Sequence, residues 1–161
     1  MSLQHFHEAQ ADPHSGYETA LTEIRCGRKT SHWIWYIFPQ LAGLGRSSMA
    51  EKYAIRDLAE ACDYLRDAVL RAHYEEITAA VRDQVALRRR GSSEGSRTVV
   101  LEDLMGSRID ALKLTSSLTL FRAAAEQLLD EDQTLESLIR LCDCILSGNA
   151  SEQGAKSEDK R

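Results

Sequence analysis

The chain has 161 residues, which is the usual size of one globular domain. Apolar residues make up 43% and charged residues 28%, and these ordinary fractions exclude a largely disordered protein. The formal charge of −5 argues against nucleic acid as a partner, because binding to a phosphate backbone requires clustered lysine and arginine.

The first ten residues are polar and include two histidines, so we expect no signal peptide there. Four cysteines without such a signal indicate reduced thiols, and we expect a cytoplasmic protein. The longest apolar run, Trp33 to Phe38, falls far short of the roughly 20 residues that cross a bilayer. We therefore expect no membrane partner, and because no ligand set has metal spacing we expect neither a metal nor a cofactor.

The first part of the chain has two helical patterns. Only two prolines occur in the sequence, which favours long helices over a turn-rich β-fold. We expect a short first helix capped by Ser2 and ended by Asp12-Pro13. Apolar residues at positions 17, 20, 21 and 24 then form one helical stripe, and Gly27 follows where a left-handed cap is wanted.

The segment from His32 to Phe38 contains both tryptophans and is stopped by Pro39. So short an apolar run fits a buried strand or a buried helical turn, and periodicity does not separate them. After a loop with glycines at 43 and 45, Ser48 and Glu51 have the spacing of a capping box. A second such box starts at residue 57, so we expect two short helices between 49 and 66.

From Val69 onward, apolar residues recur at helical spacing until Arg88-Arg89-Arg90, which we interpret as a solvated helix end. A short helix near residues 100–105 is expected to end at Gly106. Asp110 is placed to cap a longer helix that reaches residue 128.

A last helix is expected from Leu135 to Leu146, ended by Gly148. The sequence thus predicts a mainly α, compact multi-helix single domain over residues 1–148, with a short aromatic segment of undecided type. Residues 91–97 are expected to form a flexible loop or insertion, because they are rich in glycine and serine. Residues 149–161 are expected to be a disordered tail, because they have no apolar side chain beyond alanine.

Three sequence blocks follow one another in a distinctive order. The first is KTSHWIWYIFPQLAGLGRS, from Lys29 to Ser47. The others are Tyr53-Ala54-Ile55 with Glu60-Ala61 and Tyr64-Leu65, and Asp110 with Lys113-Leu114, Ser116-Ser117 and Thr119-Leu120-Phe121. Together they resemble the signature of the domain-of-unknown-function family 1810, from Phe6 to about Leu128. The resemblance implies a single, mainly helical domain without an established activity.

Some members of that family carry the label calpastatin, which implies protease inhibition. Inhibitory segments of calpastatin are disordered, whereas this chain has the patterned helices of a packed core, so we set the label aside. The sequence departs from the family pattern at Asp67-Ala68-Val69-Leu70-Arg71, where a His-Pro and a Gly are usual. The sequence therefore does not decide the structure around residue 67.

The signature block has the parts of a ligand pocket. Tryptophan or tyrosine rings can stack on a flat ring, glycines permit close approach of the backbone, and basic side chains bind phosphate or carboxylate. The expected ligand-binding residues are Lys29, Trp33, Trp35, Gln40, Gly45, Arg46, Ser47, Tyr53, Lys113, Ser116 and Ser117, with His32 as the candidate catalytic residue. We expect the helix that carries Lys113 to meet the signature block, with Lys113 near Lys29 or His32.

A structural role explains many of the same residues. Aromatic side chains are the largest contributors to core burial, at roughly 2–3 kcal/mol each. Gly43 and Gly45 fit a turn after Pro39, and a buried His32 can be satisfied by a backbone carbonyl.

Two functions stay open. The first is binding, with or without chemical conversion, of a nucleotide-like or phosphate-bearing small molecule, with a role in nucleotide or ADP-ribose metabolism as its sharpest form. The alternative is a protein-interaction or oligomerisation module that uses the aromatic block as its interface. A ligand site requires Trp33 or Trp35 to line a concavity, whereas an interface requires them on a flat or convex surface. Whether the protein is an enzyme is undecided, because the sequence has no recognised catalytic motif.

Overall fold

The computed structural model describes residues 2–91 and 97–158, and in these residues the regular secondary structure is helical. The mainly α fold expected from the sequence is confirmed. The helices are α1 (Gln4–Gln10), α2 (Tyr17–Arg25), α3 (Ile34–Ile37), α4 (Ser48–Lys52), α5 (Leu58–Arg66), α6 (Ala68–Gly91), α7 (Arg97–Met105), α8 (Arg108–Leu128), the 3-10 turn η1 (Gln133–Leu135) and α9 (Glu136–Glu158).

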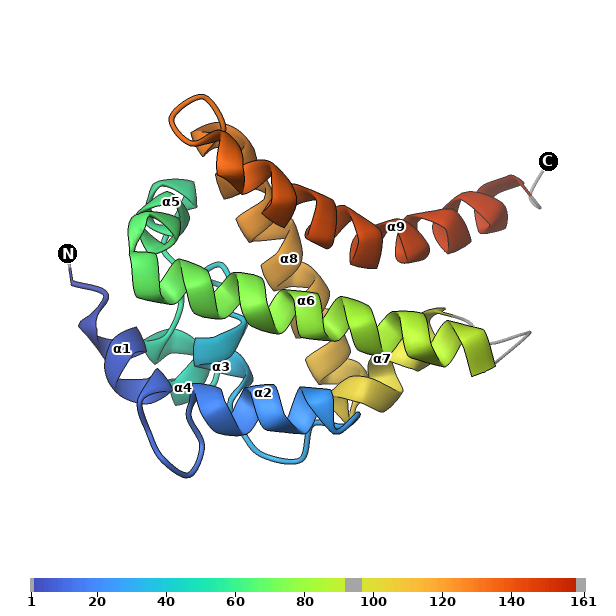
Figure 1. The fold of residues 1–161 in the computed structure, drawn as a ribbon, viewed down its shortest axis with the longest axis horizontal. Coiled ribbons are helices and arrows are strands. Elements are labelled where there is room, and N and C mark those ends of the chain that lie inside the picture. The colour runs from blue at the N-terminus through green and yellow to red at the C-terminus, as the bar shows by residue number, and fades with distance from the viewer. Residues whose placement is uncertain (1, 92–96, 159–161) are drawn as a thin grey trace.

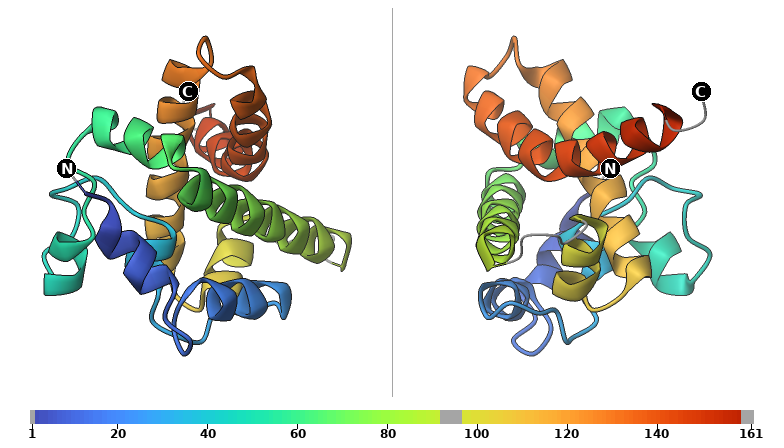
Figure 2. Two further views of the ribbon diagram at one scale, coloured as in Figure 1. Left: turned by 60° about the vertical axis from the view of Figure 1, so that its left-hand side comes forward. Right: turned by 90° about the vertical axis from the view of Figure 1, so that its right-hand side faces the viewer.

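Helix α8 is the centre of the fold and packs against α5, α7 and α9 (Figure 1). Its buried residues recur every three or four positions and form one apolar stripe: Ala111, Leu114, Leu118, Phe121, Ala125 and Leu128. Helix α6 packs against α2 on one side and α9 on the other, and the views in Figure 2 show it crossing the direction of α8. One core therefore joins the N-terminal and C-terminal helices.

The aromatic segment is one turn of helix, α3, which decides the question that periodicity left open. Trp33, Ile34 and Phe38 in and beside this turn are almost fully buried. After α3 the chain turns at Pro39, and the only β-type contact in the described residues is a bridge between Leu41 and Ile55. That bridge closes the segment of residues 42–54, which contains α4, and Tyr53 in it packs edge-on against Tyr36 of α3.

The break between α4 and α5 lies where the sequence predicted it, but two predicted caps shift. Ser47, not Ser48, caps α4, because its hydroxyl accepts the backbone N–H of Ala50. Ser107, not Asp110, caps α8 in the same way, since it accepts the N–H of Asp110. The cause is that neighbouring polar residues offer equivalent caps, and only the packed backbone selects one.

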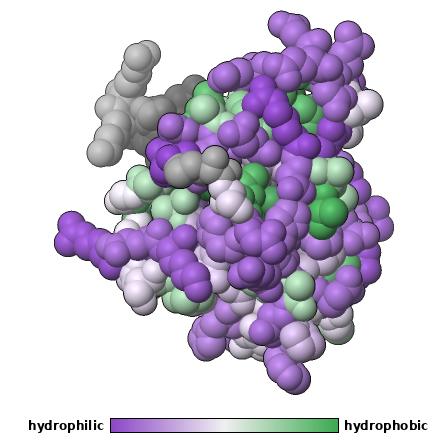
Figure 3. Space-filling view, turned by 90° about the vertical axis from the view of Figure 1, so that its left-hand side faces the viewer, coloured by the Kyte–Doolittle hydropathy of each residue, from purple (hydrophilic) through white to green (hydrophobic). Residues whose placement is uncertain are grey.

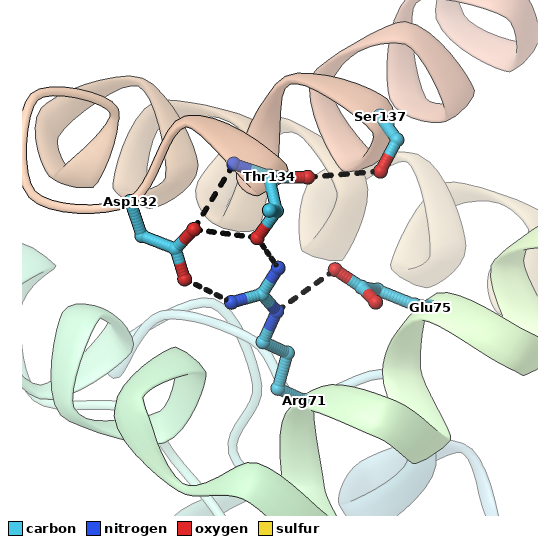
Figure 4. A network of polar contacts seen from close by, with 5 residues as sticks. All are labelled: Arg71, Glu75, Asp132, Thr134 and Ser137. Carbon is cyan, nitrogen blue, oxygen red and sulfur yellow. Dashed lines mark hydrogen bonds and ion pairs between the residues drawn. The ribbon is translucent and has the colours of Figure 1, made fainter.

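The departures from the family pattern at residues 67 and 71 have structural partners. Asp67 forms the joint between α5 and α6, where it accepts the N–H groups of Val69 and Leu70. Arg71 ties α6 to the turn before α9: its guanidinium contacts Glu75, Asp132 and Thr134 (Figure 4). No loop separates α5 from α6.

Helix α9 continues past Gly148 to Glu158, so the helix end expected at Gly148 is wrong. A single glycine costs a helix only about 1 kcal/mol, and the following residues include alanine, glutamate, glutamine and lysine, which favour helix. The expected loop at 91–97 lies between α6 and α7, and its residues 92–96 are outside the described part of the chain. The boundaries of the domain, at 1–148 with a tail of 149–161, stay a prediction.

Candidate functional site

The two tryptophans of the signature block have different environments. Trp33 is 0% exposed, and its indole Nε1 donates to Glu23 Oε1 of α2 at 3.0 Å. It therefore belongs to the core and does not form the wall of a pocket, which corrects the ligand-stacking role expected for it. Trp35 is only partly buried and packs against the edge of the core.

Glu23 organises the chain that leads into the aromatic segment. The same oxygen, Oε1, accepts the backbone N–H groups of Thr30 and Ser31 at 2.7 and 2.8 Å. Partial burial works to raise the pKa of Glu23, but hydrogen bonds from Ser31, Thr30 and Trp33 outweigh it and lower this pKa to about 2. The carboxylate is thus ionised at neutral pH and holds the signature block to α2.

Lys29 is a second structural member of the block. Its side chain is 6% exposed, and its ammonium pairs with Asp110 Oδ2 at 2.9 Å and donates to the carbonyl of Ser31 at 2.6 Å. The same ammonium lies 5.0 Å from the centroid of the Trp33 ring. Because these contacts use the charge inside the fold, Lys29 joins the block to α8 and is not placed to bind an anion.

A recess lies beside Trp35, and four of its lining residues were expected from the sequence. It is lined by Trp35, Gln40, Leu41, Gly45, Ala50 and Tyr53. Its interior has room for about one water molecule. The recess as it stands accepts a single oxygen atom rather than a whole ligand.

Two residues that line this recess carry N–H donors without partners. Trp35 Nε1 and Gln40 Nε2 are buried, and neither has a hydrogen-bond partner in the described structure. The backbone of Gln40 is fixed, because its carbonyl accepts the N–H of Ile55 at 2.8 Å. An unsatisfied buried donor costs about 1–3 kcal/mol. An acceptor oxygen placed between these two side chains would recover that cost.

Two ammonium groups lie beside aromatic rings of the recess, and a third cation follows in the adjoining loop. The ammonium of Lys113 lies 5.4 Å from the centroid of the Trp35 ring, and that of Lys52 lies 5.3 Å from the centroid of the Tyr53 ring. Arg46 is exposed in the loop that carries Gly45. Within residues 2–91 and 97–158, none of these three cations forms an ion pair. Helix α8 thus meets the signature block at Trp35 through Lys113 and at Lys29 through Asp110.

An open groove adjoins the recess, because Leu41 lines both. It has an empty volume of about 760 Å³ and runs along α8 between Leu41, Leu44, Thr115, Ser116, Thr119, Leu120 and Ala123. Ser116 thus faces this groove, as a site residue would. Ser117 is fully buried and hydrogen-bonds to the hydroxyl of Tyr74 at 3.0 Å, so it is part of the core.

Three further predicted residues are His32, Ser47 and Gly45, and the structure accounts for each of them. His32 is exposed, which corrects the interpretation of it as a buried histidine satisfied by a backbone carbonyl. The Ser47 hydroxyl caps α4. A Cβ atom on Gly45 would lie 2.6 Å from the Cβ of Ala50, so glycine is required for the loop to approach α4 this closely.

Sequence reasoning missed several residues at this site: Leu41, Leu44, Lys52, Thr115 and Thr119. Two signals pointed to them. Thr115 and Thr119 are four apart and so lie on one face of the expected helix. Leu41 and Leu44 are apolar residues in a loop, where polar residues are usual. Their proximity to one another depends on the tertiary packing of α8 against the loop.

Comparison with known proteins gives the family. A model of the family described as "Protein of unknown function (DUF1810)" matches residues 1–142, and the chain belongs to this family. Among solved structures, the fold is similar to the conserved hypothetical protein Rv1873 from Mycobacterium tuberculosis, with a TM-score of 0.62 and 37% sequence identity. The match covers 86% of this chain and 84% of that protein. No curated protein matches the chain.

Two further findings concern metal binding and membrane spanning. In the described residues, no group of three or more histidine, cysteine, aspartate or glutamate side chains is arranged to hold a metal ion. No helix among them is long and apolar enough to span a membrane.

Proposed function

We propose that the chain binds a small phosphate-bearing, nucleotide-like molecule at the recess beside Trp35 and the adjoining groove along α8. The observation that carries this proposal is the pair of buried, unpartnered N–H donors on Trp35 and Gln40, which line one recess. We further propose a cytoplasmic location, which agrees with four cysteines that are all free thiols.

The recess selects the chemistry of the group that enters it. Two N–H donors favour an acceptor, and the space available fits one oxygen atom. A phosphate or carboxylate oxygen satisfies both donors and recovers the free energy lost by their burial. The rest of the ligand then lies outside the recess, in the open groove.

The surrounding charges favour an anionic oxygen over a neutral one. Lys113 and Lys52 lie beside rings of the recess and Arg46 follows Gly45 in its loop, and none of the three forms an ion pair in the described part of a protein with a net charge of −5. Hydrogen bonds to a charged acceptor are roughly twice as strong as neutral ones. Phosphate, with several oxygens, can enter the recess and still contact the cations at its rim.

The groove suits a nucleoside. Leu41, Leu44 and Leu120 give it apolar walls, and Thr115, Ser116 and Thr119 give it hydroxyl groups. Apolar walls with a few hydrogen-bonding groups are typical of sites for small organic ligands. A base can therefore pack on the leucines while ribose hydroxyls contact the α8 hydroxyls. His32 is kept as a candidate catalytic residue only in the case that turnover of such a ligand is observed.

A protein-interaction surface is the second candidate, because apolar side chains are exposed on the same face. Leu44 is 62% exposed, and Ile109 and Leu112 on α8 are 66% and 56% exposed. Trp33 cannot contribute to such a surface because it is fully buried. The interface would therefore be centred on Leu44 and α8 rather than on the indoles.

Calorimetric titration with ADP, inorganic phosphate and adenosine tests the ligand proposal. We expect ADP to bind, phosphate to compete with it, and adenosine to bind at least about tenfold more weakly, because it lacks the anchoring oxygens. Gln40→Glu places an anion in the recess and should abolish ADP binding without lowering the melting temperature. Lys113→Met should weaken binding, whereas Arg140→Gln, which removes an equal charge from an exposed side chain of α9, should not.

The outcomes separate the two candidates. Adenosine binding as tightly as ADP, or ADP binding unchanged in Gln40→Glu, would reject the phosphate anchor. If no phosphorylated compound binds and Leu44→Asp abolishes self-association in sedimentation experiments, the interaction surface is the better account.

A further inference from the structure

A second groove lies between α1 and the start of α6, on the face shown in Figure 3. Its lining residues are Gln4, His7, Glu8, Gln10, Ala11, Val69 and His73, around an empty volume of about 680 Å³. Hydrophilic side chains dominate this face, with smaller apolar areas between them (Figure 3). None of the lining residues is a lysine or arginine, so the groove differs in charge from the recess beside Trp35.

Gln10 fixes the tautomer of His73. The amide nitrogen of Gln10 donates to the carbonyl of Tyr36 at 2.8 Å and to the Tyr64 hydroxyl at 3.0 Å. Both amide hydrogens are then used, and the Gln10 oxygen must act as an acceptor. That oxygen lies 2.8 Å from His73 Nδ1, so Nδ1 carries the hydrogen. In the neutral ring the lone pair is therefore on Nε2.

The surroundings of His73 favour its neutral form. Its ring stacks on Tyr17 with a centroid distance of 3.8 Å and an interplanar angle of 7°. Burial lowers the pKa of His73, and Glu18, Glu76 and His7 modify this effect through their charges. At pH 7.5 the imidazole is neutral and presents an acceptor nitrogen.

His7 is oriented by a carboxylate. Its Nε2 lies 2.7 Å from Asp67 Oδ2, while the other oxygen of Asp67 accepts the N–H groups at the start of α6. Partial burial works to raise the pKa of Asp67, but the N–H of Leu70 and the His7 ring outweigh it, and this pKa is lowered. An ionised Asp67 only accepts hydrogen bonds, so His7 Nε2 is the donor and Nδ1 is the nitrogen that Asp67 leaves unused.

We propose that the groove between α1 and α6 binds a small organic cation with N–H donors, an amine or a guanidinium compound. The acceptors among the lining groups are His73 Nε2, His7 Nδ1 in the neutral ring, and the carboxylate of Glu8. The glutamate supplies negative charge, and the imidazoles supply lone pairs held in position by Gln10 and Asp67. This site is separate from the phosphate site and does not depend on it.

A matched pair of ligands tests the proposal. n-Butylguanidine and n-butylurea have the same shape and both carry N–H donors, but only the first is charged. In calorimetric titrations at pH 7.5 we expect the guanidine to bind at least about tenfold more tightly than the urea. Its affinity should fall once the pH is lowered below the pKa of His73, because protonation turns the acceptor Nε2 of that ring into a donor.

Variants locate the binding. Glu8→Gln, on the exposed surface of α1, should reduce guanidine affinity about tenfold without affecting folding. His73→Phe keeps a ring against Tyr17 but removes both nitrogens, and it should reduce the affinity at least as much. His14→Asn, in an exposed loop, is the control and should leave the affinity within about twofold. Equal binding of guanidine and urea, no binding of guanidine, or an unchanged affinity in Glu8→Gln would overturn the proposal.

Discussion

The indole Nε1 of Trp33 and the carboxylate of Glu23 share a 3.0 Å hydrogen bond that joins the signature block to α2. The same carboxylate accepts two backbone N–H groups from the segment before Trp33. The most aromatic part of the sequence is thus held by one ionised side chain from a different helix. The lowered pKa of Glu23 is the thermodynamic counterpart of these contacts.

Replacing Glu23 by glutamine should destabilise the protein at neutral pH. The pKa of Glu23 falls from an ordinary 4.5 to about 2, so its contribution is complete above pH 4.5 and is lost as the pH falls toward 2. Allowing for solvent screening of a partly exposed group, we expect a loss of about 1–2 kcal/mol at pH 7. Urea denaturation from pH 7 to pH 3 measures it. The difference from wild type should shrink over that range, and Glu136→Gln, which removes only an exposed ion pair with Arg140, should cost at most about 0.5 kcal/mol.

Replacing each tryptophan by phenylalanine should distinguish their contributions to stability. Trp33→Phe leaves a cavity in a fully buried site and removes a donor from Glu23, so a loss of about 2–4 kcal/mol is expected. Trp35→Phe removes a buried donor that has no partner, which offsets the lost contact area, so the change should stay within about 1 kcal/mol. Chemical denaturation of both variants measures the contrast. Equal losses would mean that Trp35 Nε1 is satisfied after all.

Gly45 and Ala50 should be energetically coupled. An added Cβ at Gly45 would lie 2.6 Å from that of Ala50, so Gly45→Ala must push the loop away from α4. Ala50→Gly removes the obstructing atom, and the double variant should recover part of the loss. A double-mutant cycle by thermal denaturation should give a coupling of at least about 1 kcal/mol. Simple additivity would show that the loop can move without cost.

His73 should make stability depend on pH between 5 and 7. Burial lowers its pKa below the ordinary value of 6.5, so the unfolded chain binds more protons than the folded one in this range. The contribution of His73 is present above pH 6.5 and is lost as the pH falls through the lowered pKa. We expect His73→Phe to flatten the stability profile in urea titrations at pH 5, 6 and 7, with His14→Asn retaining the wild-type slope.

Local sequence patterns predicted the helices well because helix formation has a fixed period and recognisable ends. The stripe at 17, 20, 21 and 24, the glycine caps at 27 and 106, and the break between α4 and α5 all appear in the structure. The failures were at choices between similar neighbours, such as Ser47 against Ser48. They also occurred where context overrides propensity, as at Gly148.

For the site, the sequence by itself determined the family resemblance and the block that contains Trp35, Gln40, Gly45 and Tyr53, because these residues are close along the chain. Only the tertiary structure decided which of the block's residues stay available. It buried Trp33 against Glu23, paired Lys29 with Asp110, and brought Lys113 over Trp35. The physical reason is that burial and ion pairing depend on contacts between residues far apart in sequence, which periodicity does not specify.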